Sequence, residues 1–155
     1  MSFMSSNLKR ARTIADFQFG RGAGSAVFPD DSEFLMSRTN RIRQVSFNGT
    51  RIATVRARDG LLTLSMKGAH SLHDFLELPA YRVTVHADAV PFVLKGKTLF
   101  AKHVVDVDPS IRAMDEVLLV DRQNNLLVTG QALLCAAEMK DFNRGAAVAV
   151  RKGKG

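Results

Sequence analysis

Residues 116–134 read EVLLVDRQNNLLVTGQALL, and this stretch decides the fold of the second half of the chain. Two runs rich in Val and Leu, 116–121 and 126–134, flank the polar segment Asp121–Asn125, whose residue types favour a tight turn. Further strands are predicted at 81–86, 97–105 and 146–151, with a helical turn at 88–95 and a helix at 136–142. Many short strands joined by turns are typical of a small β-barrel.

The first half of the chain combines helical and β patterns. Residues 7–19 have helical periodicity and end at Gly20-Arg-Gly-Ala-Gly24. That segment follows a helix rather than a strand, so we interpret it as a helix end with a tight turn instead of a phosphate-binding loop. Asn48-Gly49 and Asp59-Gly60 are hairpin signals. They predict a three-stranded meander with strands at 41–47, 50–58 and 61–66. A helix is predicted after it, at 67–77.

A domain boundary is predicted at Leu78-Pro79-Ala80, where the helical pattern ends at a proline and a strand pattern begins. The expected domains are residues 1–78 and 79–155. The fold class is therefore α+β: a small N-terminal α+β domain, with helices packed on an antiparallel meander, precedes a small C-terminal β-barrel.

Arginine is concentrated in the meander. Residues 38–58 contain six arginines and no acidic residue. Two-residue turns would pair Phe47 with Thr50, Val45 with Ile52, Arg43 with Thr54 and Arg41 with Arg56. This register gathers four arginines at one end of the sheet: Arg41, Arg43, Arg56 and Arg58. Like charges facing each other destabilise a sheet, so we expect a polyanion to bind there. The alternative is a solvated face balanced by acids from elsewhere in the fold.

Composition excludes several classes of protein. The 155 residues carry 22 Lys and Arg against 15 Asp and Glu, a formal charge of +7, and 46% of them are hydrophobic. This is a folded basic protein rather than a disordered one. No apolar run is long enough to span a membrane, and the N-terminus lacks a secretory signal, so a cytoplasmic location is expected. A single cysteine, Cys135, excludes an internal disulfide, a zinc finger and a thiol redox pair.

Basic residues also cluster at turns of the second half. Lys95 and Lys97 flank Gly96, and Lys102 follows closely. A glycine between lysines lets a phosphodiester backbone approach the main chain, although a simple turn with solvated lysines explains the same pattern. No catalytic set can be assembled from spacing: Asp106-Val-Asp108-Pro109 has the pattern of a turn. His70 and His73 have no third ligand spaced beside them except Asp74, so neither a metal nor another cofactor is expected.

Four segments of the second half together resemble a PUA domain: 93–100 (VLKGKTLF), 115–121 (DEVLLVD), 126–132 (LLVTGQA) and 145–151 (GAAVAVR). Three segments of the first half resemble the domain that precedes the PUA domain in archaeosine tRNA-guanine transglycosylase and archaeosine synthase: 14–24 (IADFQFGRGAG), 41–43 (RIR) and 57–64 (ARDGLLTL). PUA domains are compact pseudo-barrels that bind structured RNA and are also appended to pseudouridine synthases.

The resemblance implies an RNA-binding surface on the second half. In the family the PUA domain holds the tRNA acceptor stem and its 3′ end, and the matching positions here are Lys95, Gly96, Lys97, Phe100, Lys102 and His103. The last strand and its tail would add phosphate contacts through Arg151 and Lys152. Phe100 is a candidate for stacking on a terminal base, but an apolar aromatic in a strand is more often part of the core, and we favour the core.

The resemblance also implies what this chain does not do. The family's catalytic barrel has about 250 residues, paired aspartates and a cysteine-rich zinc site, and the present sequence has room for none of these. We therefore expect a noncatalytic, archaeal tRNA-binding protein that acts in tRNA processing together with a separate catalytic tRNA-modifying protein. The alternative is a PUA-domain factor in ribosome assembly or translation.

Overall fold

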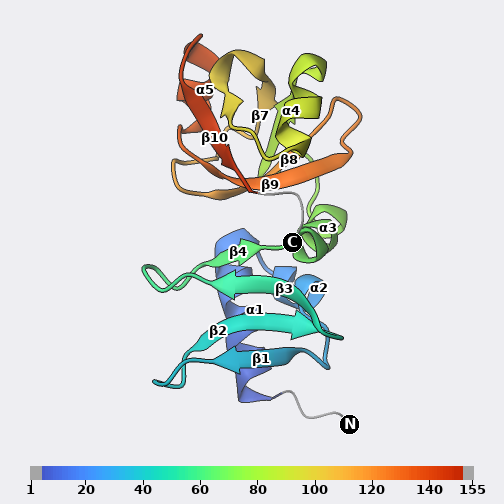
Figure 1. Ribbon diagram of the computed structural model, residues 1–155. Helices are drawn as coiled ribbons and strands as arrows, with labels where there is room; N and C mark the ends of the chain where they lie inside the picture. Colours follow the sequence, from blue (N-terminus) through green and yellow to red (C-terminus); the bar gives the residue numbers. More distant parts are fainter. Residues whose placement is uncertain (1–4, 152–155) are drawn as a thin grey trace. The chain divides into compact units, whose positions relative to one another are not determined.

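The computed structural model describes residues 5–151, and within them the chain divides into two compact units. The first unit ends at Leu76 and the second begins at Glu77. Each has its own sheet, of four strands in the first unit and six in the second (Figure 1). Lys152, for which a phosphate contact was expected, lies outside the described residues.

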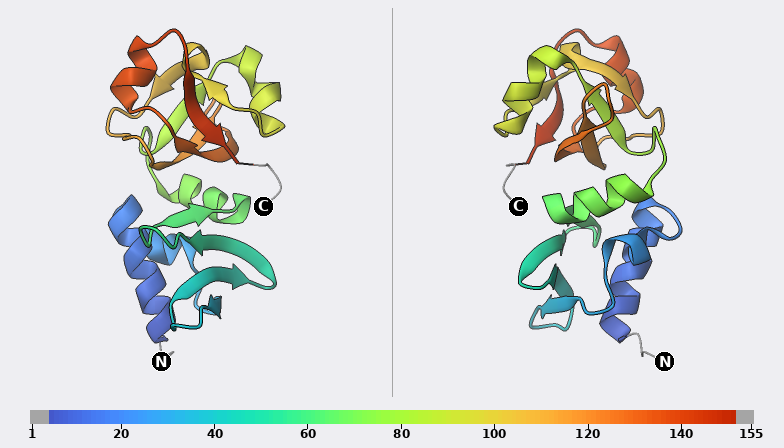
Figure 2. Two further views of the ribbon diagram at one scale, coloured as in Figure 1. Left: turned by 60° about the vertical axis from the view of Figure 1, so that its left-hand side comes forward. Right: turned by 90° about the vertical axis from the view of Figure 1, so that its right-hand side faces the viewer.

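The first unit packs a layer of helices on one face of an antiparallel sheet with strand order β1-β2-β3-β4 (Figure 2). The buried face carries Val45, Ala53, Leu62 and Leu64, and the helices bury Leu8, Ala15 and Leu72 against it. The elements of this unit, in chain order, are α1 (Ser6–Phe19), α2 (Ala23–Val27), β1 (Glu33–Met36), β2 (Ile42–Phe47), β3 (Thr50–Val55), β4 (Leu62–Leu64) and α3 (Met66–Phe75).

Helices α1 and α2 cross closely because Gly24 has no side chain. A Cβ atom at Gly24 would lie 2.3 Å from the carbonyl oxygen of Arg12 in α1. The Gly24 N–H also donates to the Asp16 carboxylate, at 2.7 Å. Gly20 ends α1 with a φ of 115°, as expected for a helix terminus. The predicted turn at 20–24 is confirmed up to Gly22, and the second helix that starts at Ala23 was missed.

The predicted meander is confirmed in outline and wrong in three details. Short strand β1 adds a fourth strand at the edge, β3 ends at Val55 rather than at 58, and the register slips. Phe47 pairs with Thr50 as predicted, but Val45 faces Ala53 and Gln44 faces Thr54. Ile52 is the extra residue of a β-bulge, which moves every later pair by one position. The expected pairs Val45–Ile52 and Arg43–Thr54 do not form.

The second unit is a nearly closed pseudo-barrel built on a sheet of order β6-β10-β9-β8-β5-β7. Its centre is β8 (Glu116–Val120), all five residues of which are buried. The predicted hairpin formed by β8 and β9 is confirmed, and β8 also pairs in parallel with β5. The remaining elements are β5 (Arg82–Val85), η1 (Ala87–Ala89), α4 (Val90–Leu94), β6 (Leu99–Phe100), η2 (Ala101–His103), β7 (Val104–Val107), β9 (Leu126–Ala132), α5 (Ala136–Asp141) and β10 (Ala146–Val150).

One strand prediction in this unit is wrong. The expected strand at 97–105 is broken by the 3₁₀ turn η2, so that β6 and β7 pair with different strands. Strand β6 pairs with β10, whereas β7 pairs with β5. The break turns the chain from one edge of the sheet to the other, and such a turn closes the barrel.

Candidate functional site

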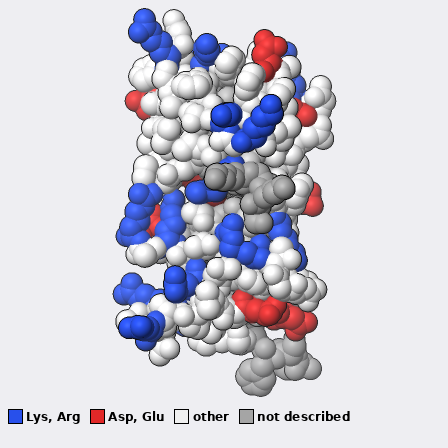
Figure 3. Space-filling model, in the orientation of Figure 1, with Lys and Arg blue, Asp and Glu red and all other residues white. Residues whose placement is uncertain are grey.

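A groove in the first unit brings together the four arginines singled out in the sequence. It has a volume of 720 Å³ and lies at the end of the sheet where the β1–β2 and β3–β4 loops project. We call it the arginine groove. Its lining includes Leu35, Ser37, Thr39, Arg41, Arg43, Gln44, Thr54, Arg56, Arg58 and Asp59. In Figure 3, groups of Lys and Arg atoms lie on the left-hand side of this unit, where Figure 1 places these two loops, and other Lys and Arg atoms lie further to the right.

The β1–β2 loop holds Arg41 on one wall of the groove. The Ser37 hydroxyl accepts hydrogen bonds from the N–H groups of Thr39 (3.3 Å) and Arg41 (3.1 Å). The Ser37 N–H in turn donates to the Arg41 carbonyl, at 2.8 Å. Asn40 takes a positive φ of 60°, which asparagine tolerates well. The loop is therefore closed by its own hydrogen bonds.

Arg43 enters the groove from a second β-bulge. Leu35 of β1 faces Gln44 and Met36 faces Ile42, so Arg43 is the extra residue of β2. A bulge of this kind re-aims a side chain relative to the regular strand. Arg41 and Arg43 are both exposed, and neither forms an ion pair with any residue between 5 and 151.

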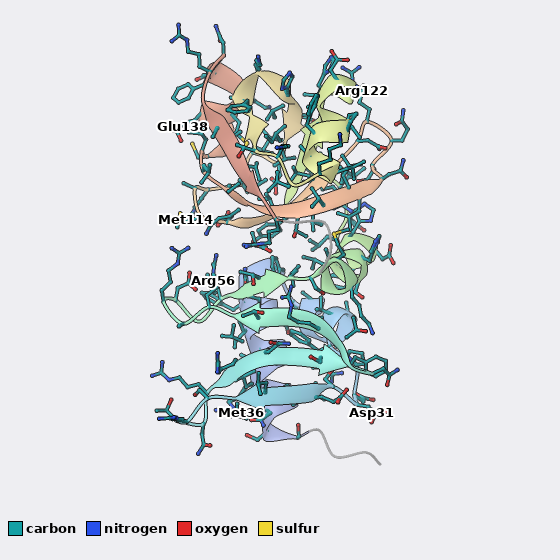
Figure 4. The ribbon with its side chains drawn as sticks, viewed as in Figure 1. Asp31, Met36, Arg56, Met114, Arg122 and Glu138 are labelled. Atoms are coloured by element: carbon teal, nitrogen blue, oxygen red, sulfur yellow. The ribbon has the colours of Figure 1, made fainter. Side chains whose placement is uncertain are left out.

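The opposite wall is the β3–β4 loop, which is organised by Asp59. Arg56 forms a two-point ion pair with Asp59, in which the Nε–Oδ1 distance is 3.1 Å and the Nη2–Oδ2 distance is 3.0 Å. The Leu61 N–H donates to the same carboxylate. Burial raises the pKa of Asp59, but the Leu61 hydrogen bond and the charges of Arg56 and Arg58 outweigh it and lower the pKa below its ordinary value. Figure 4 labels Arg56 beside this loop.

This ion pair corrects the expected arrangement of the arginine patch. Arg56 has a carboxylate partner within its own loop, so the expectation of four arginines without a nearby acid is wrong for this residue. Arg56 lies beyond the end of β3, and Arg41 lies before the start of β2, so the predicted cross-strand pair is absent as well. The two residues nevertheless line the same groove, from opposite loops.

The second unit places Lys95 and Lys97 on an exposed turn at the end of α4. The N–H groups of Lys95 and Lys97 both donate to the Phe92 carbonyl, at 3.1 and 3.0 Å, and Gly96 between them has a φ of 85°. This left-handed conformation is one that glycine adopts at low cost, so the turn favours a glycine here. Both lysine side chains are exposed.

Phe100 is exposed, which corrects the expectation that it belongs to the core. Phe100 is 45% accessible to solvent. It lines a hollow of 270 Å³ together with Lys102 and three residues of the loop before β10: Asn143, Arg144 and Gly145. The Ala101 N–H donates to the Gly145 carbonyl at 2.9 Å and ties the two segments together. Sequence reasoning missed Arg144, although the Arg144-Gly145 pair resembles the Lys-Gly-Lys turn in composition.

The remaining predicted site residues have other contacts. His103 is half-buried, and its ring centre lies 6.4 Å from that of His86. Arg151 forms a two-point ion pair with Glu116, which is almost wholly buried. Its charge is therefore balanced inside the barrel, which argues against the expected phosphate contact.

The described residues show neither a metal centre nor a membrane span. Between residues 5 and 151, no three His, Cys, Asp or Glu side chains gather as ligands. No helix in this part of the chain has the length and apolar character needed to cross a bilayer.

Each of the two units, the small α+β unit and the pseudo-barrel, matches a known sequence family. Residues 81–154 match the PUA domain. Residues 9–79 match the patch-forming domain C2 of tRNA-guanine transglycosylase. The chain therefore consists of a patch-forming C2 domain followed by a PUA domain, which confirms the resemblance found in its motifs.

Individual relatives are archaeal enzymes much longer than this chain. The tRNA-guanine(15) transglycosylase of Methanothermobacter thermautotrophicus is 50% identical over 148 residues, which cover 95% of this chain and 23% of the enzyme. The enzyme of the same name from Pyrococcus furiosus is 52% identical over 140 residues, covering 90% of this chain and 24% of the enzyme. The chain thus spans about a quarter of the length of these relatives.

Solved structures confirm the fold. A hypothetical protein from Pyrococcus horikoshii is 25% identical and superposes with a TM-score of 0.72 over 94% of this chain and 89% of that one. A conserved PUA-domain protein from Thermoplasma acidophilum is 22% identical, with a TM-score of 0.63 and the same coverage of both chains.

Proposed function

We propose that this chain is a noncatalytic tRNA-binding component of tRNA modification and that a separate protein supplies the transglycosylase chemistry. The observation that carries the proposal is the pair of domain matches. Residues 9–79 match a patch-forming C2 domain, and residues 81–154 match a PUA domain. The relatives that share these domains at about half identity are tRNA-guanine(15) transglycosylases. We expect the protein to act in the cytoplasm.

The physical basis of binding is electrostatic. RNA carries one negative charge per phosphate, and a protein that neutralises phosphates gains affinity by releasing counterions. A formal charge of +7 and two exposed basic surfaces supply the cations. Double-stranded RNA is read mostly through its shape and backbone, so an acceptor stem does not require base-specific side chains.

We assign the tRNA contact of the PUA domain to two segments that are close in the sequence, the turn at 95–97 and the hollow at Phe100. The Lys95-Gly96-Lys97 turn offers two exposed ammonium groups beside a tightly turned backbone. The hollow at Phe100 adds an accessible ring with Lys102 and Arg144 around it. A ring of this kind stacks on an unpaired base and would suit the single-stranded 3′ end of a tRNA. His103 is half-buried and does not line this hollow, and Arg151 forms an ion pair with Glu116, so neither residue is assigned to the contact.

The test is a binding comparison among RNAs with the intact protein. We expect full-length tRNA and an acceptor-stem minihelix with its single-stranded 3′ end to bind with similar affinity, and an anticodon stem-loop of equal length to bind more weakly. Adding the protein to a transglycosylase that lacks its own RNA-binding domains should restore guanine exchange into tRNA. Guanine exchange by the protein alone would contradict the proposal. A clear preference for ribosomal RNA over tRNA would instead favour a role in ribosome assembly or translation.

A further inference from the structure

We infer that the arginine groove of the C2 domain is a second RNA site, which receives an unpaired nucleotide and the phosphates on either side of it. The inference rests on the proposed function in one respect, that the chain binds RNA. It assigns a different surface from that of the PUA domain and a different form of the ligand, a single strand rather than a stem.

The net positive charge of the groove favours binding of an anion. Four arginines and one aspartate line it, a net charge of +3, and the aspartate is already held by Arg56. Arg41 and Arg43 are exposed on the other wall, without an ion pair among residues 5–151. The planar guanidinium group binds phosphate through two parallel hydrogen bonds, which a lysine cannot do. Two such groups on one wall suit consecutive phosphates of a strand.

The floor of the groove suits a base rather than a second row of phosphates. Leu35, Gln44 and Thr54 face one another across β1, β2 and β3, so their side chains share one face of the sheet. Leu35 is 54% accessible and offers an apolar surface. The Gln44 amide makes no side-chain hydrogen bond within the described part of the chain, which leaves its two donors and one acceptor for a ligand.

Size distinguishes a single nucleotide from a stem. Pockets for small ligands have volumes of about 300–1,000 Å³, and the arginine groove, at 720 Å³, lies within that range. A duplex keeps its bases stacked inside, whereas an unpaired base can be turned out into a hollow and stack on a guanidinium plane. Among the described residues, no aromatic side chain lines the groove, so we expect an arginine of the opposite wall, Arg56 or Arg58, to provide that plane.

Both walls are preorganised. Ser37 closes the loop that carries Arg41, and Asp59 closes the loop that carries Arg56, each through several hydrogen bonds. Loops held in place before binding lose little conformational freedom when the ligand arrives. A solvated arginine cluster has no need of such fixed walls, and this difference favours a binding site.

The experiment uses the whole protein and a five-nucleotide single-stranded RNA with a photoreactive 4-thiouridine at its centre. We expect cross-linking to peptides from residues 33–60, and a loss of affinity of about tenfold or more in the double variant Arg41→Gln/Arg43→Gln, because two phosphate contacts are lost. The matched control, Lys9→Gln/Arg21→Gln, removes the same charge from exposed positions of the same unit outside the groove and should change affinity less than twofold. Gln44→Ala should weaken binding without any change in charge.

Different outcomes separate this inference from the proposed function. If tRNA binds but the oligonucleotide cross-links only to residues 77–151, the groove assignment is wrong and the proposed function stands. If neither RNA binds the wild-type protein, both are wrong. If the Arg41→Gln/Arg43→Gln variant binds the oligonucleotide normally but no longer associates with a transglycosylase, the groove is a protein contact and the inference is overturned. The cross-link needs no variant, so a misfolded variant does not remove the test.

Discussion

Arg151 and Glu116 form an ion pair that links the end of β10 to the start of β8, two strands separated in the sheet by β9. The Glu116 side chain is 1% exposed and the Arg151 side chain is 34% exposed. The pair therefore ties the end of β10 to the buried centre of the PUA domain.

Replacing Arg151 should destabilise the PUA domain without weakening RNA contacts. Arg151→Met removes the cation that faces a buried carboxylate, and loss of one partner of a buried pair costs about 3–5 kcal/mol. Urea unfolding followed by circular dichroism measures this loss. The exposed Arg144→Met is the control and should leave the unfolding midpoint unchanged. A variant that is as stable as the wild type, but binds tRNA with a smaller salt dependence, would mean that Arg151 contacts phosphate after all.

The substitution Gly24→Ala, which adds a methyl group in helix α2, should destabilise the C2 domain. The new Cβ atom would lie 2.3 Å from a backbone oxygen of α1, so the two helices have to separate. Overpacking of a core costs about 1–3 kcal/mol, and contact with rigid backbone favours the upper end of that range. Ser25→Ala, at an exposed position of the same helix, should change the free energy of unfolding by less than about 0.5 kcal/mol. Equal stability of the two variants would show that the helices do not cross as described.

Charge reversal at the Lys95-Gly96-Lys97 turn should reduce the salt dependence of tRNA binding. Each phosphate contact contributes about 0.7–0.9 to the slope of log K against log salt concentration, so Lys95→Glu/Lys97→Glu should lower the slope by about 1.4–1.8. Fluorescence anisotropy over a range of salt concentrations measures it. Lys9→Glu/Arg112→Glu changes the net charge equally at exposed positions outside both surfaces and should leave the slope nearly unchanged. Identical slopes for the two variants would rule out the turn as a phosphate contact.

Removing the ring of Phe100 should weaken RNA binding more than it weakens the fold. Stacking of one base on an aromatic ring is worth about 1–3 kcal/mol, which corresponds to a loss of affinity of roughly 5–150-fold for Phe100→Ala. The residue is 45% accessible, so the loss of stability should be small. The comparison is best made with tRNA that either retains or lacks its unpaired 3′ nucleotides. If Phe100→Ala affects both RNAs equally, the ring does not stack on that end.

The contacts of Asp59 that close the β3–β4 loop should persist to a lower pH than those of an aspartate with an ordinary pKa. The pKa of Asp59 is lowered in the folded protein, so its contribution to stability is complete above its unfolded pKa, near pH 4, and is lost as the pH falls through the folded value. An NMR titration of the Asp59 carboxyl carbon measures this midpoint. Arg56→Gln should raise the midpoint, because the cation that favours the carboxylate is gone. An unchanged midpoint in that variant would contradict the role given to Arg56.

Local signals predicted the turns of this protein and the strands next to them. Asp121–Asn125 fixes the β8–β9 hairpin, and Asn48-Gly49 fixes the Phe47–Thr50 pair, because turn residues act on their immediate neighbours. The bulge at Ile52 depends on a distant contact. Its carbonyl accepts hydrogen bonds from the N–H and hydroxyl of Ser65, and Gly68 packs against the same carbonyl. No local sequence pattern indicates the contact between Ile52 and Ser65, and the predicted register is wrong from Ile52 onward.

The composition of the candidate site was predictable, but its geometry was not. The density of arginine in residues 38–58 pointed to the groove, and the Lys-Gly-Lys turn pointed to the PUA surface. The Arg56–Asp59 pair, the Arg151–Glu116 pair and the exposure of Phe100 depend on where loops turn in space. Asn143 and Arg144 reach Phe100 only because β10 pairs with β6, across more than forty residues of chain.

Among the described strands, β6 is hydrogen-bonded only to β10, so the position of Phe100 depends on a strand that is synthesised more than forty residues later. A nascent chain on the ribosome that has not yet released residues 146–150 leaves β6 without its neighbour and the edge of β9 unpaired. Within the described part of the chain, the strands of the C2 domain pair with one another, so this domain does not wait for residues 146–150. During translation the chain therefore acquires its two candidate RNA surfaces in sequence, the one at Phe100 last.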